Sequence, residues 1–329
     1  MPDLSLSLAI SYYDHVVDVV RGKIRPEGIS LIPCELPNEE IFFRMLHFGE
    51  WDVAEFSMAK YVAVVAAGAP PFRAIPVFPS RMFRQSSVYV ATSAGITRPG
   101  DLQCRRVGVP EWGQTAGVYA RAYLQHQCGV SLREIQWVQA GVNEAGRKEK
   151  VDLSLPAGVA IERVADRSLT EMLLAGDLDA IISAREPSAF LAGDPRIVRL
   201  WPDSRPLEEA YFRATGVFPI MHVIVVKSQT LDANPWIAMN LFTAFEAAKK
   251  NSLRGLSANT TSRIPVPWSQ HFVRETQSIF GEDCWPYGLE PNRRTLEAFL
   301  QYCCEQGVTD RKLQVSELFP KEFSKLVKV

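Results

Sequence analysis

Polar side chains that hold anions and exchange protons stand where the apolar segments of this 329-residue chain end. Arginine offers a planar fork that binds a carboxylate through two hydrogen bonds, and several arginines occur in this set. Carboxylates, aromatic residues and two histidines accompany them. The set comprises Tyr13, Asp14, His15, Glu55, Ser57, Arg81, Arg84, Gln114, Thr115, Arg185 and His222. Gathered in one cleft, these residue types favour a small ligand that carries carboxylate groups.

The segments before these residues read as strands and helices in alternation. Residues 4–10 alternate apolar and polar side chains, and residues 28–36 and 52–57 are two further strand-like runs. Between the last two, Asn38 is a suitable N-cap for a helix that ends at Gly49. A strand-helix-strand order predicts a parallel sheet with crossover helices. The loops at the carboxyl ends of such strands form the ligand crevice.

The pattern repeats in the middle of the chain, which predicts a second lobe. Residues 45–53 and 172–180 both read M-L-x-x-G-acid-x-D-aliphatic, a helix that ends on glycine and leads into a strand. We expect lobe one to comprise residues 1–95 and 210–329, and lobe two residues 96–209, with a ligand cleft between them. The predicted fold is a two-lobed α/β protein, each lobe a mainly parallel sheet flanked by helices.

Composition excludes several classes of partner. The net charge is −1 and the pI is near 6.5, so no basic field is present to hold nucleic acid or an anionic membrane. No apolar stretch reaches the roughly 18 residues of a membrane span, and the first residues lack the pattern of a secretory signal. The six cysteines show no C-x-x-C spacing, which is typical of reduced thiols. We therefore expect a cytoplasmic protein.

Several segments spread over residues 5–250 carry a resemblance to one family. They are Tyr13-Asp14-His15, residues 39–56 (EEIFFRMLHFGEWDVAEF), residues 75–84 (IPVFPSRMFR), residues 106–111 with Thr115-Ala116, residues 146–150 (GRKEK) and residues 215–222 (TGVFPIMH). In these segments the sequence resembles the 4,5-dihydroxyphthalate decarboxylase family. FPSRMFR and FPIMH are the more specific of them, whereas the helix-turn-strand segments are generic.

The resemblance implies the type II periplasmic-binding-protein fold and a cytoplasmic lyase of phthalate catabolism. The implied reaction removes one carboxylate from 4,5-dihydroxyphthalate and leaves protocatechuate, without an organic cofactor. One turn departs from the family, because a Tyr-Gln-Met-Thr-Ala sequence is expected where this chain has Trp112-Gly113-Gln114-Thr115-Ala116. That turn is expected to face the ligand from lobe two, so a related hydroxylated aromatic acid stays open as the substrate.

The implied reaction needs a base near a ring hydroxyl, an acid near the ring carbon that loses its carboxylate, and a clamp on the other carboxylate. We assign the acid–base chemistry to Asp14 and His222, with His15 and Glu55 in reserve. We assign the charged contacts to the substrate to four arginines, Arg81, Arg84, Arg147 and Arg185. We assign the neutral contacts to the substrate to hydroxyl and amide side chains, namely Tyr13, Ser57, Gln114 and Thr115.

The sequence also allows purely structural roles for these residues and other functions for the protein. Arg81 and Arg84 can pair with acids across a loop, Asp14 can cap a helix, and His222 can be a hydrogen-bonded core residue. No H-x-x-E-H, H-E-x-x-H or cysteine cluster is present, so we expect no metal, although scattered His and Asp residues can converge in space. The main alternative function is a solute-binding protein for a small carboxylate ligand, without catalysis. A sensor domain, a synthase that consumes its own active-site residue, and a homo-oligomer are also left open.

Overall fold

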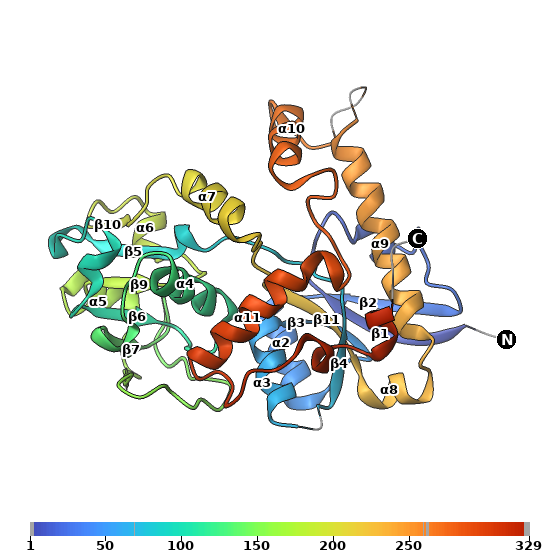
Figure 1. Ribbon diagram of the computed structural model, residues 1–329, viewed down its shortest axis with the longest axis horizontal. Helices are drawn as coiled ribbons and strands as arrows, with labels where there is room; N and C mark the ends of the chain where they lie inside the picture. The colour runs from blue at the N-terminus through green and yellow to red at the C-terminus, as the bar shows by residue number, and fades with distance from the viewer. Residues whose placement is uncertain (1–2, 69, 259, 261–262, 326–329) are drawn as a thin grey trace.

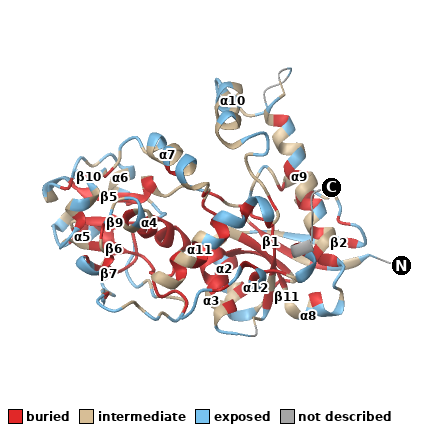
Figure 2. Ribbon diagram, in the orientation of Figure 1, coloured by how far each residue is buried: buried red, intermediate tan, exposed pale blue. Residues whose placement is uncertain are grey.

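The structure, a computed structural model, describes residues 3–68, 70–258, 260 and 263–325. Two lobes lie side by side, each built around one β-sheet, and helix α11 (Arg293–Glu305) runs along the junction between them (Figure 1). Buried residues fill the inner strands of both sheets and the helix α4 (Thr115–His126), and one buried apolar cluster extends from the first sheet into the second lobe (Figure 2).

The sheet of the first lobe has, within the described residues, five strands in the order β2-β1-β3-β11-β4. Strands β2, β1 and β3 are parallel, as predicted, whereas β11 is antiparallel to both of its neighbours. The strands are β1 (Leu4–Ile10), β2 (Ile29–Glu35), β3 (Val53–Ser57), β4 (Phe72–Ile75) and β11 (His222–Lys227). Because β11 is antiparallel to β3, the last residue of β3, Ser57, lies opposite the first residue of β11, His222.

The sheet of the second lobe has six strands in the described part of the chain, in the order β10-β5-β9-β6-β7-β8. Strands β9, β6, β7 and β8 are parallel, and β5 is antiparallel to both β9 and β10. The strands are β5 (Val88–Ala91), β6 (Arg106–Val109), β7 (Gln136–Gln139), β8 (Ile161–Arg163), β9 (Ala180–Ile182) and β10 (Ile197–Arg199). Both sheets are therefore mixed.

The structure corrects the predicted lobe boundary near residue 95. Strand β5 pairs with β9 and β10, so the chain enters the second lobe between β4 and β5 rather than after residue 95. It returns between β10 and β11. The sequence misleads here because the apolar pattern of residues 88–91 identifies a strand but not the sheet that the strand joins.

Helices cover the sheets, and several of them end at a glycine. The predicted ends of α2 and α5 are confirmed, since Gly49 and Gly176 follow them with φ of 53° and 82°. The longer helices are α2 (Asn38–Phe48), α3 (Met58–Ala66), α4, α5 (Leu169–Ala175), α7 (Arg205–Thr215), α9 (Ile237–Leu256), α10 (Ser269–Phe280) and α11. The shorter ones are α1 (Val17–Val20), α6 (Ser188–Leu191), α8 (Ser228–Ala233) and α12 (Val315–Leu318). Among the described helices, none is both long and apolar enough to cross a membrane.

Helix α11 joins the lobes, because it contacts α3 in the first lobe and α4 in the second. Gln306, directly after α11, accepts a hydrogen bond from Arg121 Nε at 2.8 Å and donates one to the Val118 carbonyl at 2.9 Å. Its own carbonyl accepts the indole N–H of Trp112 at 2.7 Å. The Arg121 guanidinium lies 3.8 Å from the centre of the Trp112 ring, and neither side chain has exposed surface.

We predict that Gln306→Leu destabilises the protein by about 2–4 kcal/mol, because it leaves Arg121 Nε and the Val118 carbonyl buried without partners. Urea unfolding measures the change in the free energy of unfolding. Gln301→Leu, on the half-buried side of the same helix, is the control and changes it by less than about 1 kcal/mol. Equal effects of the two substitutions would contradict a special role for Gln306 in joining the lobes.

Candidate active site

A cavity of about 380 Å³ lies between the lobes and collects most of the predicted site residues. This volume suits a small aromatic ligand. The predicted residues that line it are Tyr13, Ser57, Arg84, Gln114, Thr115, Arg147, Arg185 and His222. Lining residues that the sequence reasoning missed include Asn38, Glu39, Lys60 and Ser80. Asn38 and Lys60 belong to the first turn of helices that follow strands, which is the signal that could have identified them.

Three helices begin at this cavity. Its lining includes Asn38 at the start of α2, Lys60 in the first turn of α3, and Thr115 at the start of α4. The first backbone N–H groups of a helix lack partners inside the helix, and they favour an anion nearby. The Thr115 hydroxyl joins two of these ends, because it lies 3.0 Å from the Ser57 hydroxyl and accepts a hydrogen bond from the backbone N–H of Ala59.

A buried carboxylate holds the catalytic candidate His222. Glu55 has no exposed surface, and its Oε1 lies 2.5 Å from Nδ1 of His222 and accepts a hydrogen bond from the Tyr13 hydroxyl at 2.5 Å. Its Oε2 accepts the backbone N–H of Ser11 at 2.8 Å. With Nδ1 engaged by Glu55, the other ring nitrogen of His222, Nε2, has no protein partner among the described residues and is free for a ligand in the cavity.

The environment keeps Glu55 ionised and Tyr13 neutral. Burial raises the pKa of Glu55, but the hydrogen bonds from His222, Tyr13 and Ser11 outweigh it and hold that pKa below its ordinary value. Burial and the neighbouring Glu55 carboxylate raise the pKa of Tyr13 well above its ordinary value. A carboxylate bound to Nδ1 fixes the imidazole so that Nε2 can accept a proton, and it stabilises the imidazolium that results.

Arg84 presents a guanidinium to the cavity without a counterion from the protein. In the described part of the chain no carboxylate forms an ion pair with it, and its Nε contacts the sulfur of Met221 at 3.1 Å. Burial lowers the pKa of Arg84 to about 10, so the group is still charged at neutral pH. Arg185, an exposed residue that lines the cavity from the second lobe, likewise forms no ion pair with a described carboxylate. Two cations without protein counterions beside one cavity, Arg84 half-buried, favour an anionic ligand.

Arg147 and Lys60 also line the cavity, but protein carboxylates neutralise them. The Arg147 fork donates to both oxygens of Glu39 at 3.0 Å, and it lies 2.7 Å from the fully buried Glu111. Glu111 is also 3.2 Å from both Lys60 Nζ and Lys150 Nζ. Glu39 and Lys60 belong to the first lobe and the others to the second, so this ion-pair network ties the lobes together. Arg147 is therefore less available to a ligand than the sequence suggested.

Four predicted residues do not line the cavity: Glu55, which lies behind His222, and Asp14, Arg81 and His15. Asp14 is exposed, because the turn after Tyr13 points its side chain to solvent. Arg81 is 4% exposed and donates to the carbonyls of Phe218 and Pro286 and to Asn292 Oδ1, so it braces loops and does not clamp a ligand. His15 packs against Tyr13, Trp285 and Tyr287.

The turn that departs from the expected family sequence faces the cavity with part of its residues. The Trp112 side chain is in the core against Trp137, while Gln114, Thr115 and Ala116 alone of this turn line the cavity. Among the described residues, no group of three or more His, Cys, Asp or Glu side chains is arranged to hold a metal ion.

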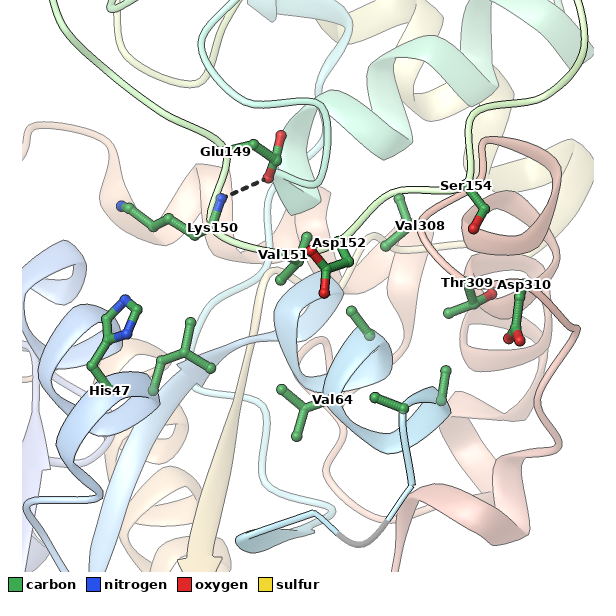
Figure 3. Close-up of a pocket in the computed structure, with 14 residues that line it drawn as sticks. His47, Val64, Glu149, Lys150, Val151, Asp152, Ser154, Val308, Thr309 and Asp310 are labelled. Atoms are coloured by element: carbon green, nitrogen blue, oxygen red, sulfur yellow. Dashed lines mark hydrogen bonds between the residues drawn. The ribbon is translucent and has the colours of Figure 1, made fainter.

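A larger cavity of about 500 Å³ lies elsewhere along residues 149–154 and contains none of the predicted site residues. Figure 3 shows His47 and Val64 on one side of it, and Val308, Thr309 and Asp310 on another. The Glu149 carboxylate accepts the backbone N–H groups of Trp112, Gly113 and Lys150. This cavity lacks both a free buried cation and a histidine-carboxylate pair, so we take the smaller cavity between the lobes as the site.

Two named proteins resemble the chain in sequence. A 4,5-dihydroxyphthalate decarboxylase of Comamonas testosteroni is 35% identical over 320 residues, which are 97% of either chain. A second protein of that name, from Pseudomonas putida, is 38% identical over 215 residues, 65% of this chain and 83% of its own. No protein-family model matches the chain.

Solved structures confirm the fold. The sulfonate-binding protein SsuA of Methylobacillus flagellatus superposes with a TM-score of 0.57 and 14% identity, covering 98% of this chain and 94% of its own. The aliphatic sulphonate-binding protein SsuA of Escherichia coli gives 0.53 and 14%, covering 96% and 92%. The two lobes thus have the fold of periplasmic binding proteins, as predicted.

The surroundings of His15 predict a loss of stability in acid. Burial lowers the pKa of His15 to about 4, whereas an unfolded chain has a histidine pKa near 6.5. As the pH falls from about 6.5 to 4, the unfolded state therefore binds a proton that the folded state does not, and stability decreases by about 3 kcal/mol. His15→Phe keeps the ring packing and is expected to lose this part of the pH dependence. Urea unfolding at several pH values measures it.

The control for His15→Phe is His47→Gln, which replaces an exposed histidine. We expect this variant to keep the pH dependence of the wild type. A His15→Phe protein with the unchanged wild-type dependence would show that His15 is not held neutral.

Proposed function

The chain belongs to the 4,5-dihydroxyphthalate decarboxylase family, and we propose that it converts 4,5-dihydroxyphthalate to protocatechuate and carbon dioxide in phthalate degradation. The observation that carries the proposal is one cavity lined by both a half-buried arginine without a protein counterion, Arg84, and His222, which is paired with the buried carboxylate of Glu55. The first recognises a carboxylate ligand, and the second exchanges protons with it.

The substrate's own chemistry defines what the cavity has to supply. In 4,5-dihydroxyphthalate each carbon that bears a carboxylate has a hydroxyl group para to it. Removing the proton of that hydroxyl pushes electron density onto the carbon. A proton then added to the carbon gives a dienone, and loss of carbon dioxide restores the aromatic ring. The protein must hold the spectator carboxylate, accept the hydroxyl proton and supply a proton to the ring carbon.

We assign the carboxylate contacts to Arg84, Arg185 and the turn at Gln114 and Thr115, and the hydroxyl contacts to His222. Arg84 and Arg185 carry free positive charge, and Thr115 and Gln114 add neutral hydrogen-bonding groups. Nε2 of His222 accepts the hydroxyl proton, and the Glu55 carboxylate stabilises the imidazolium. Tyr13 acts through Glu55, to which its hydroxyl donates a hydrogen bond.

We further propose that the reaction takes place in the cytoplasm. All six cysteines are free, which is typical of a reducing compartment. The substrate would then be an intracellular metabolite, in contrast to the external ligands that a periplasmic binding protein meets.

The test of the proposed function is to mix metal-stripped protein with 4,5-dihydroxyphthalate and to measure carbon dioxide and protocatechuate by chromatography. Catalytic turnover supports the proposal without a metal. Turnover that appears only after a divalent metal is added back supports the decarboxylase but adds a metal requirement. Tight binding without turnover in either condition overturns the proposal in favour of a solute-binding protein.

We predict that His222→Gln lowers kcat by about 10²–10⁴-fold, because it removes the proton acceptor while keeping a polar side chain. Glu55→Gln is expected to lower kcat as well, since a neutral amide no longer stabilises the imidazolium. Steady-state kinetics and equilibrium binding of unreactive phthalate separate the two effects. If His222→Gln weakens binding but leaves kcat intact, His222 is a ligand contact and not the base.

We predict that Arg84→Gln weakens phthalate binding by about 1.5–3 kcal/mol, or roughly 10–150-fold, because a charge-assisted hydrogen bond is lost. Arg84→Lys restores the charge but not the planar fork, so it recovers only part of the affinity. Isothermal titration calorimetry measures the dissociation constants. Arg98→Gln, an exposed arginine outside the cavity lining, is the matched control. Unchanged affinity in Arg84→Gln would remove Arg84 from the carboxylate contacts.

A further inference from the structure

We propose that Lys60 donates the proton that replaces the departing carboxylate on the ring carbon. This inference rests on the proposed decarboxylation and names the acid that the reaction still lacks. His222 serves the hydroxyl end of the substrate. Because that hydroxyl is para to the reacting carbon, the two positions lie at opposite ends of the ring, and a second side chain has to deliver the proton.

The side chains that line the cavity leave few proton donors. Hydroxyl and amide groups are too weakly acidic, and guanidinium groups keep their protons. Although burial raises the pKa of Glu39, the Arg147 fork outweighs it and lowers that pKa, so Glu39 has no proton to give. The Tyr13 hydroxyl is committed to Glu55. Of the described lining residues, His222 and Lys60 are then the two that exchange protons readily.

Lys60 lies in the first turn of α3, next to a residue assigned to the carboxylate. It follows Ala59, whose backbone N–H donates a hydrogen bond to the Thr115 hydroxyl at 3.0 Å. The side chain is 6% exposed, and its Nζ is 3.2 Å from Oε2 of Glu111 in the second lobe. This ion pair with Glu111 fixes the position of the ammonium group at the cavity wall.

The ion-pair network around Lys60 makes the ammonium a better acid. Arg147 and Lys150 contact the same Glu111 carboxylate, so in these ion pairs three cations meet the two carboxylates of Glu39 and Glu111. One positive charge is in excess. Burial, with help from the Lys150 and Arg147 charges, lowers the pKa of Lys60 although Glu111 opposes the shift. Proton transfer from a lysine with a lowered pKa is a known form of acid catalysis.

Proton transfer from Lys60 to the ring carbon precedes the loss of carbon dioxide. An N–H bond of the Lys60 ammonium breaks and a C–H bond forms at the ring carbon, using the electron pair that the hydroxyl oxygen supplied after His222 took its proton. The bond from the ring carbon to the carboxylate then breaks, its electron pair returns to the ring, and neutral carbon dioxide leaves. His222 returns its proton to the oxygen. Lys60 recovers a proton from water, so the net reaction consumes one proton from solvent.

The decisive variant is Lys60→Arg, which keeps the positive charge and the ion pair with Glu111 but holds its protons too tightly to donate. We expect kcat to fall about 100-fold while KM changes less than about threefold and Tm stays within a few degrees. Lys249→Arg is the matched control, because Lys249 is a buried lysine paired with Asp283 outside the cavity lining. Its kcat is expected to equal that of the wild type.

Chemical rescue separates a proton donor from a structural cation. Lys60→Ala is expected to regain activity when ethylammonium is added, with a rate that depends on the acidity of the added amine, whereas Lys60→Arg is not rescued. In the wild type, kcat is expected to fall as the pH rises through the lowered pKa of Lys60, and this basic limb disappears in Lys60→Ala.

Three results would overturn the inference. Lys60→Arg with more than a third of the wild-type kcat removes Lys60 from proton donation, as does a Lys60→Ala protein that amines do not rescue. In both cases a wild type that still produces protocatechuate leaves the proposed function standing. A wild-type protein without turnover overturns the proposed function and this inference together.

Discussion

The burial of one carboxylate, Glu111, constrains how the two lobes meet. An ionised carboxylate in the protein interior is costly unless cations and hydrogen bonds compensate it. Glu111 has no exposed surface, and its compensation comes from Lys60 in the first lobe and from Arg147 and Lys150 in the second. Separating the lobes would break the ion pairs that cross between them, Lys60 with Glu111 and Arg147 with Glu39. The network therefore favours the arrangement in which both lobes face the cavity.

The same constraint divides the cations of the cavity into two groups. Arg147 and Lys60 are held by Glu39 and Glu111, whereas Arg84 and Arg185 form no ion pair in the described structure. The first group sets the electrostatic potential of the cavity, and the second is free to form an ion pair with a carboxylate of the ligand. Proteins of this fold that bind sulfonates also bind anions, so anion recognition alone does not distinguish an enzyme from a binding protein. The histidine-carboxylate pair is the feature that favours catalysis.

Sequence patterns predicted the elements well and the pairing of charges poorly. The helix ends at Gly49 and Gly176 were predictable because a left-handed residue after an amphipathic helix is a local property. The sheet to which residues 88–91 belong was not, since strand pairing depends on distant segments. Likewise His222 was predicted as a site residue, but its link to Glu55 needed the antiparallel register of β11 on β3.

The sequence could not show which of the candidate arginines is available to a ligand. Arg81, Arg84 and Arg147 look alike in sequence, and what distinguishes them is whether a carbonyl or carboxylate from another part of the chain already holds the guanidinium. Arg81 is held by loops near residues 218, 286 and 292, which no local pattern connects to it. Lys60 was missed for the opposite reason, because a lysine in the first turn of a helix usually points to solvent.

The position of β11 between β3 and β4 has a consequence for how the protein is made. Strands β1 to β4 leave the ribosome first, but their sheet lacks an inner strand until β11 follows, whereas all the strands of the second sheet emerge in one continuous stretch. The second lobe can thus fold on the nascent chain while the first waits. His222 opens β11, so the strand that completes the first sheet also delivers the imidazole to Glu55. The growing polypeptide therefore has no histidine-carboxylate pair until its last sheet is complete.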